Sequence, residues 1–228
     1  MFYAIQTFFQ LLPAEIESAK PLKMKLSVPA VKIADHPRFS YRGVMIDVSR
    51  HFFTVEELKK QISVMAMLKL NRLHLHLTDN QGWRIAIDKY PQLVEYSAVQ
   101  ETYNEELYGP CYYTKEDIKE LVAYADRHHI EVIPEIEFPG HSLSALVPFP
   151  GLSCSGGPFK SEQVFGYEED VFCVGNDSVF TFMENVLTEI AELFPARYLH
   201  IGADECVKRY WKTCHRCQAL DKRLNIRP

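Results

Sequence analysis

Two adjacent carboxylates, Asp204 and Glu205, follow a stretch that is typical of a buried β-strand, in the segment RYLHIGADEC (197–206). Like charges in contact push the pKa values of the two groups apart, so one acid stays ionised while its neighbour can hold a proton. A proton donor beside a charged partner is the arrangement that glycosidic bond hydrolysis uses. Taken alone, such a pair is more often a charge pair at a helix N-terminus, so its surroundings decide its function.

Polar side chains also follow three earlier strand-like segments. The set comprises Arg50 and His51 after the first, Asp79, Asn80 and Trp83 after the second, and Glu137 and His141 after the third. The carboxyl ends of parallel strands meet at one rim of a sheet, so we expect these side chains to lie near Asp204 and Glu205. This rim would combine acids, an arginine, a histidine and a tryptophan. Such a set suits a polar ligand that is rich in hydroxyl groups.

Strand-like and helix-like segments alternate along the chain, which predicts a parallel sheet in an α/β fold. The expected strands cover 42–49, 71–78, 130–137 and 197–204, and the expected helices cover 54–70, 114–130, 176–194 and 206–224. Long loops after the strands and tight turns before them favour a (β/α)8 TIM-barrel type over a doubly wound sheet. Four units are about half of such a barrel, which needs ~250 residues.

The alternation within the strands predicts which side chains face inward. Leu73, Leu75 and Leu77 lie on one face of their strand, and His74, His76 and Thr78 lie on the other. The inward set across the four strands comprises Asp47, His74, His76, Glu135 or Glu137, and His200. Buried polar groups must pair, so we expect a hydrogen-bonded network beneath the rim. Both rim acids can face the pocket only if the strand turns away near Gly202 and Ala203.

Composition and charge restrict the class of protein. The 228 residues are 47% hydrophobic and 24% charged, with a net charge of −5, which is typical of a globular domain. Without a basic stripe or an apolar run of ~18 residues, neither nucleic-acid binding nor a membrane span is expected. Residues 1–40 read as an amphipathic helix and linker leading in from a missing N-terminal domain, not as a signal peptide, and 41–228 read as the half-barrel. The compartment is not determined.

Six cysteines allow more than one interpretation. Cys154 and Cys173 flank a glycine-rich loop and could form a disulfide if the protein is exported, or they could remain thiols. Cys214 and Cys217 form a lone CxxC motif, and without a second pair nearby in sequence it gives little support for a zinc or redox site.

Three long segments carry a close resemblance to a known family. They are YRGVMIDVSRHFFTVEELKKQISVMAMLKLNRLHLHLTDNQGWRI, EVIPEIEFPGHS and LHIGADEC. In order and spacing they resemble β-N-acetylhexosaminidases of glycoside hydrolase family 20. The resemblance implies a retaining exo-glycosidase that removes terminal β-linked N-acetylglucosamine or N-acetylgalactosamine from an oligosaccharide or glycoconjugate. It implies no metal or organic cofactor.

The resemblance also implies a role for each rim residue. The substrate's own 2-acetamido oxygen attacks the anomeric carbon and forms an oxazolinium ion, with Glu205 as general acid and then general base. Asp204 orients the acetamido group, Arg50 holds ring hydroxyls, and Asp79 and His141 lie in the pocket.

The sequence departs from the family pattern at two sites: Ala203 replaces the usual glycine, and Glu137 stands where many members have aspartate. The family's tryptophan walls and acetamido-binding tyrosine belong to a second half-barrel that the sequence lacks, so we expect this chain, as a fragment, to be inactive alone.

Two other functions stay open at this point. His74 and His76 form an HxH pair that, with Asp79 and His141, could hold a metal in a metal-dependent barrel hydrolase. The chain could also be a non-catalytic sugar-binding or assembly module in which two half-barrels pair. The oligomeric state is not determined by the sequence.

Overall fold

The computed structural model describes residues 1–21, 23–101, 107–160 and 170–225. The parts of the two predicted loops at 102–106 and 161–169 lie outside these residues. The described elements are α1 (Phe2–Gln10), η1 (Ala14–Glu17), β1 (Gly43–Asp47), α2 (Val55–Met67), β2 (Arg72–His76), β3 (Thr78–Asp79), β4 (Gly82–Trp83), α3 (Gln92–Ser97), β5 (Gln100–Glu101), β6 (Leu107–Tyr108), α4 (Lys115–Arg127), β7 (Glu131–Glu135), α5 (Leu143–Leu146), η2 (Pro150–Leu152), α6 (Asp177–Leu193) and α7 (His215–Leu224). Within the described ranges, no helix combines the length and apolarity that crossing a bilayer requires.

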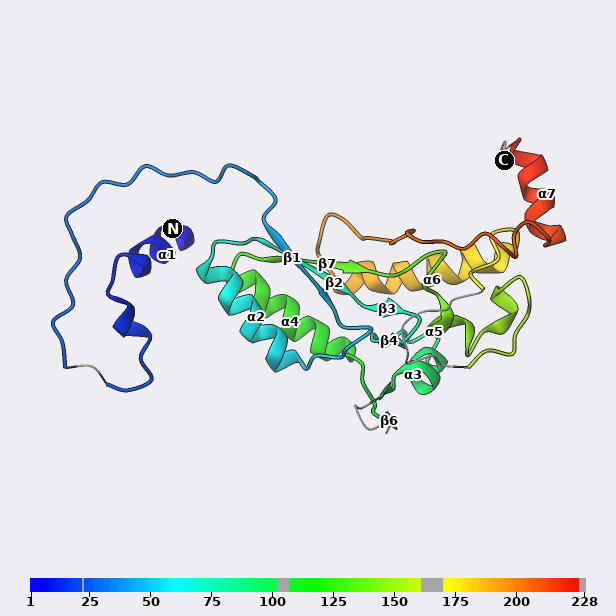
Figure 1. Cartoon of the computed structure of the whole chain (residues 1–228), viewed down its shortest axis with the longest axis horizontal. Helices are drawn as coiled ribbons and strands as arrows, with labels where there is room; N and C mark the ends of the chain where they lie inside the picture. The colour runs from blue at the N-terminus through cyan, green and yellow to red at the C-terminus, as the bar shows by residue number, and fades with distance from the viewer. Residues whose placement is uncertain (22, 102–106, 161–169, 226–228) are drawn as a thin grey trace.

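A parallel sheet in the order β1-β2-β7 forms the centre of the chain (Figure 1). Asp47, His76 and Glu135 lie side by side in register at the carboxyl ends of these strands. His200 adds a fourth parallel position through a bridge to Glu135. The polar residues that follow the strands therefore start from one edge, as the alternating pattern predicted.

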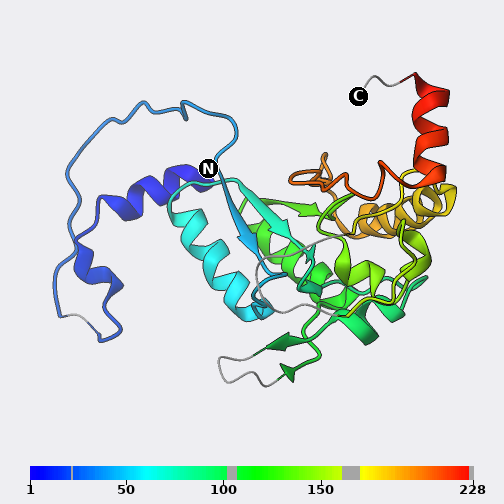
Figure 2. The same ribbon diagram turned by 45° about the vertical axis from the view of Figure 1, so that its right-hand side comes forward.

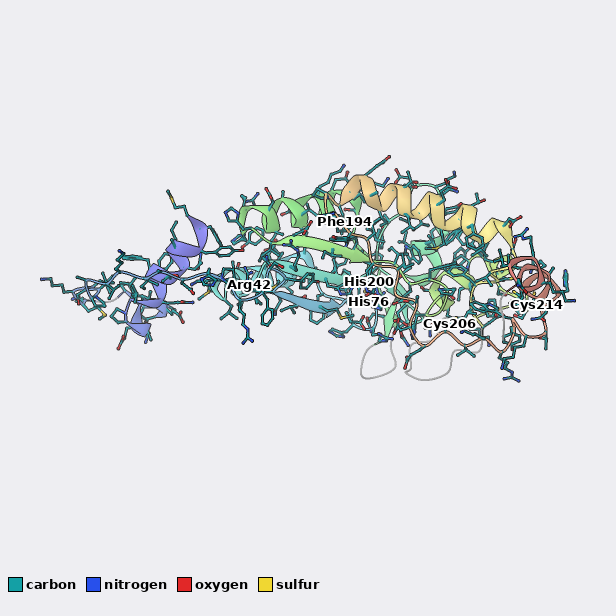
Figure 3. The ribbon with its side chains drawn as sticks, turned by 90° about the horizontal axis from the view of Figure 1, so that it is seen from above. Arg42, His76, Phe194, His200, Cys206 and Cys214 are labelled. Carbon is teal, nitrogen blue, oxygen red and sulfur yellow. The ribbon has the colours of Figure 1, made fainter. Side chains whose placement is uncertain are left out.

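The helices pack on one face of the sheet, and Figure 3 shows α4 and α6 along one side of the strands. Leu73, Leu75 and Leu77 on β2 and just after it are fully buried in this layer. The helices α2 and α4 each begin with a capping box, formed by Thr54 with Glu57 and by Thr114 with Asp117. Such caps satisfy backbone N–H groups that the first helical turn leaves without partners.

The predicted strand at 197–204 is wrong in extent, because the segment pairs with the sheet only around His200. The His200 N–H donates to the Pro134 carbonyl, and the Ile136 N–H donates to the His200 carbonyl. One further bond runs from the Phe138 N–H to the Ile201 carbonyl. The segment has a described neighbour on one side only, and its backbone turns into the left-handed region at Gly202. Pairing therefore ends before a regular strand can form.

The predicted helix at 206–224 is also too long, since α7 begins only at His215. The preceding segment is held in turns by tertiary contacts. The Trp211 indole N–H donates to the Phe172 carbonyl at 2.9 Å, and the Cys214 sulfur lies 3.7 Å from the Cys173 sulfur. These contacts with a distant loop outweigh the helical propensity of the sequence.

The N-terminal helix α1 and the segment after it lie at the amino ends of the strands, whereas α7 lies at the opposite end of the molecule (Figures 1 and 2). The Gln10 amide donates to the Met67 carbonyl, and the Lys69 amine donates to the Thr7 hydroxyl, so α1 contacts the turn before β2. Arg42 also lies at this end, far from His76 (Figure 3). Arg42 directly precedes β1, so it lies at the edge of the sheet opposite the rim.

Candidate active site at the carboxyl ends of the strands

Arg50 is held at the rim by two carboxylates from neighbouring strands. Its guanidinium lies 2.7 Å from the Asp47 carboxylate and 2.8 Å from the Asp79 carboxylate. The Asp47 carboxylate also accepts the Arg50 backbone N–H at 3.0 Å, which fixes the turn directly after β1. Because charge-assisted contacts orient a guanidinium strongly, these two carboxylates fix the position of the Arg50 side chain at the rim.

The predicted hydrogen-bonded network lies beneath the rim. The two ring nitrogens of His76 contact Glu135 at 2.6 Å and Asp79 at 2.8 Å. The Glu135 carboxylate also lies 2.9 Å from a ring nitrogen of His74 and 2.6 Å from a ring nitrogen of His200. One buried carboxylate therefore ties together the inward faces of three neighbouring segments.

Burial and hydrogen bonding act in opposite directions on this network, and the hydrogen bonds prevail. Burial alone would lower the pKa of His76, but its bonds to Asp79 and Glu135 raise it to about 10. Burial alone would raise the pKa of Asp79, but its bonds from His141 and His76 hold it well below the usual range. The pKa of Glu135 is lowered in the same way, by His74 and His76. The network thus keeps a cationic imidazole between two anions.

Glu137 differs from the other network acids because its charged neighbours do not offset its burial. Its Oε2 atom is buried and lacks a hydrogen-bond partner among the described residues, and its Oε1 atom lies 3.7 Å from the His76 ring. Burial, followed by repulsion from Glu135, raises the pKa of the Glu137 carboxyl to about 8. The backbone of Gly202 packs against this carboxyl so closely that a Cβ atom on Gly202 would overlap it.

We therefore expect Glu137→Gln to make the protein more stable against unfolding at high pH. A carboxyl with a raised pKa favours folding at low pH, and its contribution is lost as the pH rises from its ordinary value of 4.5 through about 8. Thermal unfolding midpoints should be similar for variant and wild type near pH 5 and higher for the variant near pH 9. Glu192→Gln, on the exposed face of α6, is the control and should give no such divergence. Parallel curves for the wild type and Glu137→Gln would contradict the assignment.

His141 connects the buried network with the two rim acids. Its Nδ1 atom lies 3.2 Å from the Asp79 carboxylate, and its Nε2 atom lies 3.7 Å from Asp204 and 3.6 Å from Glu205. The side chains of Asp204 and Glu205 are 65% and 80% exposed, so their carboxylates are open to an approaching ligand. The structure thus brings Arg50, Asp79, His141 and the acid pair to one rim.

The backbone that carries the acid pair leaves the sheet through unusual conformations. Gly202 has a φ of 62°, Ala203 a φ of 79° and Glu205 a φ of 44°. This is the turn that lets neighbouring acids face one side. Because a Cβ atom disfavours the left-handed region, Ala203 carries strain that a glycine would avoid. Backbone strain of this kind concentrates at functional sites.

Two residues near the rim differ from the expectation. Trp83 is 2% exposed, and its indole N–H donates to the Ile85 carbonyl, so it is a core residue and not part of the rim. Arg84, which the sequence pattern did not single out, is fully buried and donates to the carbonyls of Ser49, Val99 and Cys111. Its partners come from separate segments, so no local pattern could have marked it as the residue that supports the turn before Arg50.

The metal set considered from the sequence does not assemble among the described residues. His74 groups with Glu135 and His200, whereas His141 groups with Asp204 and Glu205. His76 uses both ring nitrogens on carboxylates. The HxH pair, Asp79 and His141 therefore do not converge on one ion.

Comparison with known proteins agrees with the geometry. Residues 39–227 match the family model described as glycosyl hydrolase family 20, catalytic domain. The chain is 49% identical over 217 residues to a β-hexosaminidase of Porphyromonas gingivalis, covering 95% of this chain and 28% of that protein. The Streptomyces plicatus N-acetyl-β-hexosaminidase in complex with Thio-NAglucal superposes with a TM-score of 0.85 at 42% identity, over 97% of this chain and 43% of that one.

A further solved structure, the Flavobacterium johnsoniae chitobiase, superposes with a TM-score of 0.86 at 32% identity, over 99% of this chain and 32% of that chain. The chain therefore spans less than half the length of each of these relatives, and its sheet and helices form part of a (β/α)8 barrel. With the rim residues gathered at the ends of parallel strands and most of its length matched by the family model, the chain belongs to glycoside hydrolase family 20.

Proposed function

We propose that this chain carries the acid–base part of a β-N-acetylhexosaminidase active site, which removes terminal β-linked N-acetylhexosamine with retention of configuration. The observation that carries the proposal is the contact of His141 with Asp79 on one side and with both Asp204 and Glu205 on the other. The relatives named above are hexosaminidases or a chitobiase, and one was solved in complex with Thio-NAglucal. The proposal extends that activity to the protein containing this chain.

The arrangement of the acids favours attack by the substrate itself. The positive-φ turn that carries Asp204 and Glu205 places both carboxylates beside His141, so they approach a ligand from the same side. Glu135 and Asp79 are buried and paired with histidines, Asp47 is paired with Arg50, and Glu137 is buried. No described carboxylate of this rim thus stands opposite Glu205 to act as nucleophile, and the acetamido oxygen of the sugar is suited to that role.

In this mechanism each residue has a distinct task. Glu205 donates a proton to the leaving oxygen and later removes one from water. Asp204 orients the acetamido N–H and stabilises the positive charge that develops on it. Arg50 binds ring hydroxyls from a position fixed by Asp47 and Asp79, and His141 holds the acid pair against the network. A preorganised set of charges of this kind lowers the barrier without reorganising during the reaction.

Substrate analogues test the proposal in the natural protein that contains this chain. An aryl β-N-acetylglucosaminide should be hydrolysed, and the aryl β-glucoside, which has a hydroxyl in place of the acetamido group, should be hydrolysed slower by a factor of at least ~10². Fluorination of the acetyl group should lower the rate progressively, since it weakens the internal nucleophile. Equal rates for the glucoside and the acetamido sugar would refute substrate assistance.

A further inference from the structure

Four cysteines from three separate segments meet at the end of the molecule that carries α7. Cys154 follows η2, Cys173 precedes α6, and Cys214 and Cys217 lie at the start of α7. The backbone brings the first two segments together, since the Cys173 N–H donates to the Leu152 carbonyl at 2.8 Å. The lone CxxC motif of the sequence therefore has a second cysteine pair beside it in space. Figure 3 labels Cys214 at this end, beyond Cys206, the residue that follows Glu205.

The distances between the sulfur atoms fit a metal better than disulfides. The four Sγ atoms all lie within 4.8 Å of one another. Cys154–Cys217 and Cys173–Cys217 are separated by 3.6 Å, and Cys173–Cys214 by 3.7 Å. A tetrahedron of thiolates at the usual Zn–S length of about 2.3 Å has edges of about 3.8 Å. Bonded sulfur atoms would instead be separated by about 2.0 Å.

Hydrogen-bond donors surround these sulfur atoms. The Cys214 sulfur accepts the backbone N–H groups of Arg216 and Cys217, and the Cys217 sulfur accepts the N–H of Gly175. The Arg216 side chain also contacts the Cys214 sulfur, which places a cation beside the four thiols. Donors to ligand atoms orient them and stabilise their negative charge in metal sites. Zinc with four thiolates carries a net charge of −2, which a neighbouring arginine offsets in part.

The loop before α6 is shaped to approach the CxxC turn. A Cβ atom on Gly175 would overlap the backbone of Arg216 and Cys217, so only glycine permits this contact. Cys173 is fully buried and Cys217 is 5% exposed, while the other two cysteines are half-buried. The cluster is therefore packed inside a structural junction and is not an exposed redox pair.

We infer that Cys154, Cys173, Cys214 and Cys217 bind one structural zinc ion. Four thiolates in tetrahedral geometry select zinc or iron, and zinc is the usual ion in closed four-cysteine sites. The ion would join the loop after β7 to the segment that follows Glu205. The chain between Glu205 and Cys214 would thereby be anchored at both ends, at the rim and at the metal.

Metal analysis of the full 228-residue chain, expressed with zinc in the medium and purified without chelator, tests this inference. We expect about one zinc ion per chain, and after its removal Co²⁺ should bind with the visible spectrum of tetrahedral thiolate coordination. Removing zinc should lower the thermal unfolding midpoint by roughly 5–10 °C, and adding zinc should restore it. These measurements need no variant to fold.

Variants then locate the ion. Cys214→Ser should reduce the zinc content to background, whereas Cys111→Ala, which changes a cysteine outside the cluster, should keep it. Zinc retained by Cys214→Ser would overturn the inference, because the ion would then sit elsewhere, for instance on the histidine network. Disulfides between these cysteines in the intact mass, iron in place of zinc, or four thiols that bind no zinc would overturn it equally.

Discussion

Replacing Glu205 with glutamine is expected to lower kcat by roughly 10²–10⁴-fold on substrates with sugar leaving groups. Glutamine keeps the shape of the side chain but cannot give a proton to the leaving oxygen. An aryl leaving group that departs as a stable anion needs less protonation, so kcat for such a substrate should fall less. Steady-state kinetics of the natural protein that contains this chain measure both effects.

A matched control separates chemistry from folding. Glu184→Gln makes the same change on the exposed face of α6 and should leave kcat, KM and the pH profile unchanged. Circular dichroism and unfolding midpoints should be the same for both variants, because the Glu205 side chain is 80% exposed and contributes little packing. If Glu205→Gln hydrolysed sugar and aryl substrates at wild-type rates, Glu205 could not be the general acid.

The largest loss of stability is expected from His76→Leu. His76 is buried and bonds to Glu135 and Asp79, so its removal leaves two buried carboxylates without their shared cation. Breaking a buried ion pair from one side costs about 3–5 kcal/mol of the free energy of unfolding. Glu135 retains His74 and His200, and Asp79 retains Arg50, which limits but does not cancel the loss. Denaturant unfolding of the variant and the wild type measures the difference.

The effect of His76→Leu should depend on pH in a defined way. The pKa of His76 is raised from 6.5 to about 10, so its contribution is fully present below pH 6.5 and is lost as the pH rises through 10. The pKa values of Asp79 and Glu135 are lowered, so their contributions disappear as the pH falls below their ordinary values of 3.8 and 4.5. The difference between wild type and variant should therefore be greatest near pH 6.

His36→Leu is the control for this variant, because His36 is exposed and lies in the segment before β1, outside any helix or strand. It should change the free energy of unfolding by less than about 0.5 kcal/mol at any of these pH values. A loss of stability for His76→Leu that is equally large at pH 6 and pH 10 would indicate lost packing and not a lost ion pair.

Local patterns in the sequence predicted much of the fold. The helices α2 and α4 begin at threonine caps that the sequence shows directly, since a cap depends on residues three positions apart. The inward position of His76 and the outward, buried position of Leu75 follow from the two-residue period of a strand. These features are short in range, and the parallel sheet follows from the alternation of strands and helices.

The last two segments were predicted less well. The 197–204 segment has a described neighbour on one side only, and the start of α7 depends on contacts with a distant loop.

The rim residues were identified from their positions after the strands, but the sequence could not give their contacts. His141 reaches both Asp79 and Glu205 only because its own backbone and that of Ala203 adopt positive φ values, which no spacing rule indicates. Trp83 follows a strand as the rim residues do, yet local geometry turns it into the core.

The sequence by itself thus determined the alternation of strands and helices, the inward face of each strand and the acid pair at the rim. Only the tertiary structure decided that Cys154 and Cys173 lie beside the CxxC motif, and that Arg84 supports the turn before Arg50. The reason is the range of the interactions. Caps and strand periods connect residues two to four positions apart, whereas the sulfur atoms of Cys154 and Cys217 are brought together across 63 positions by the packing of whole segments.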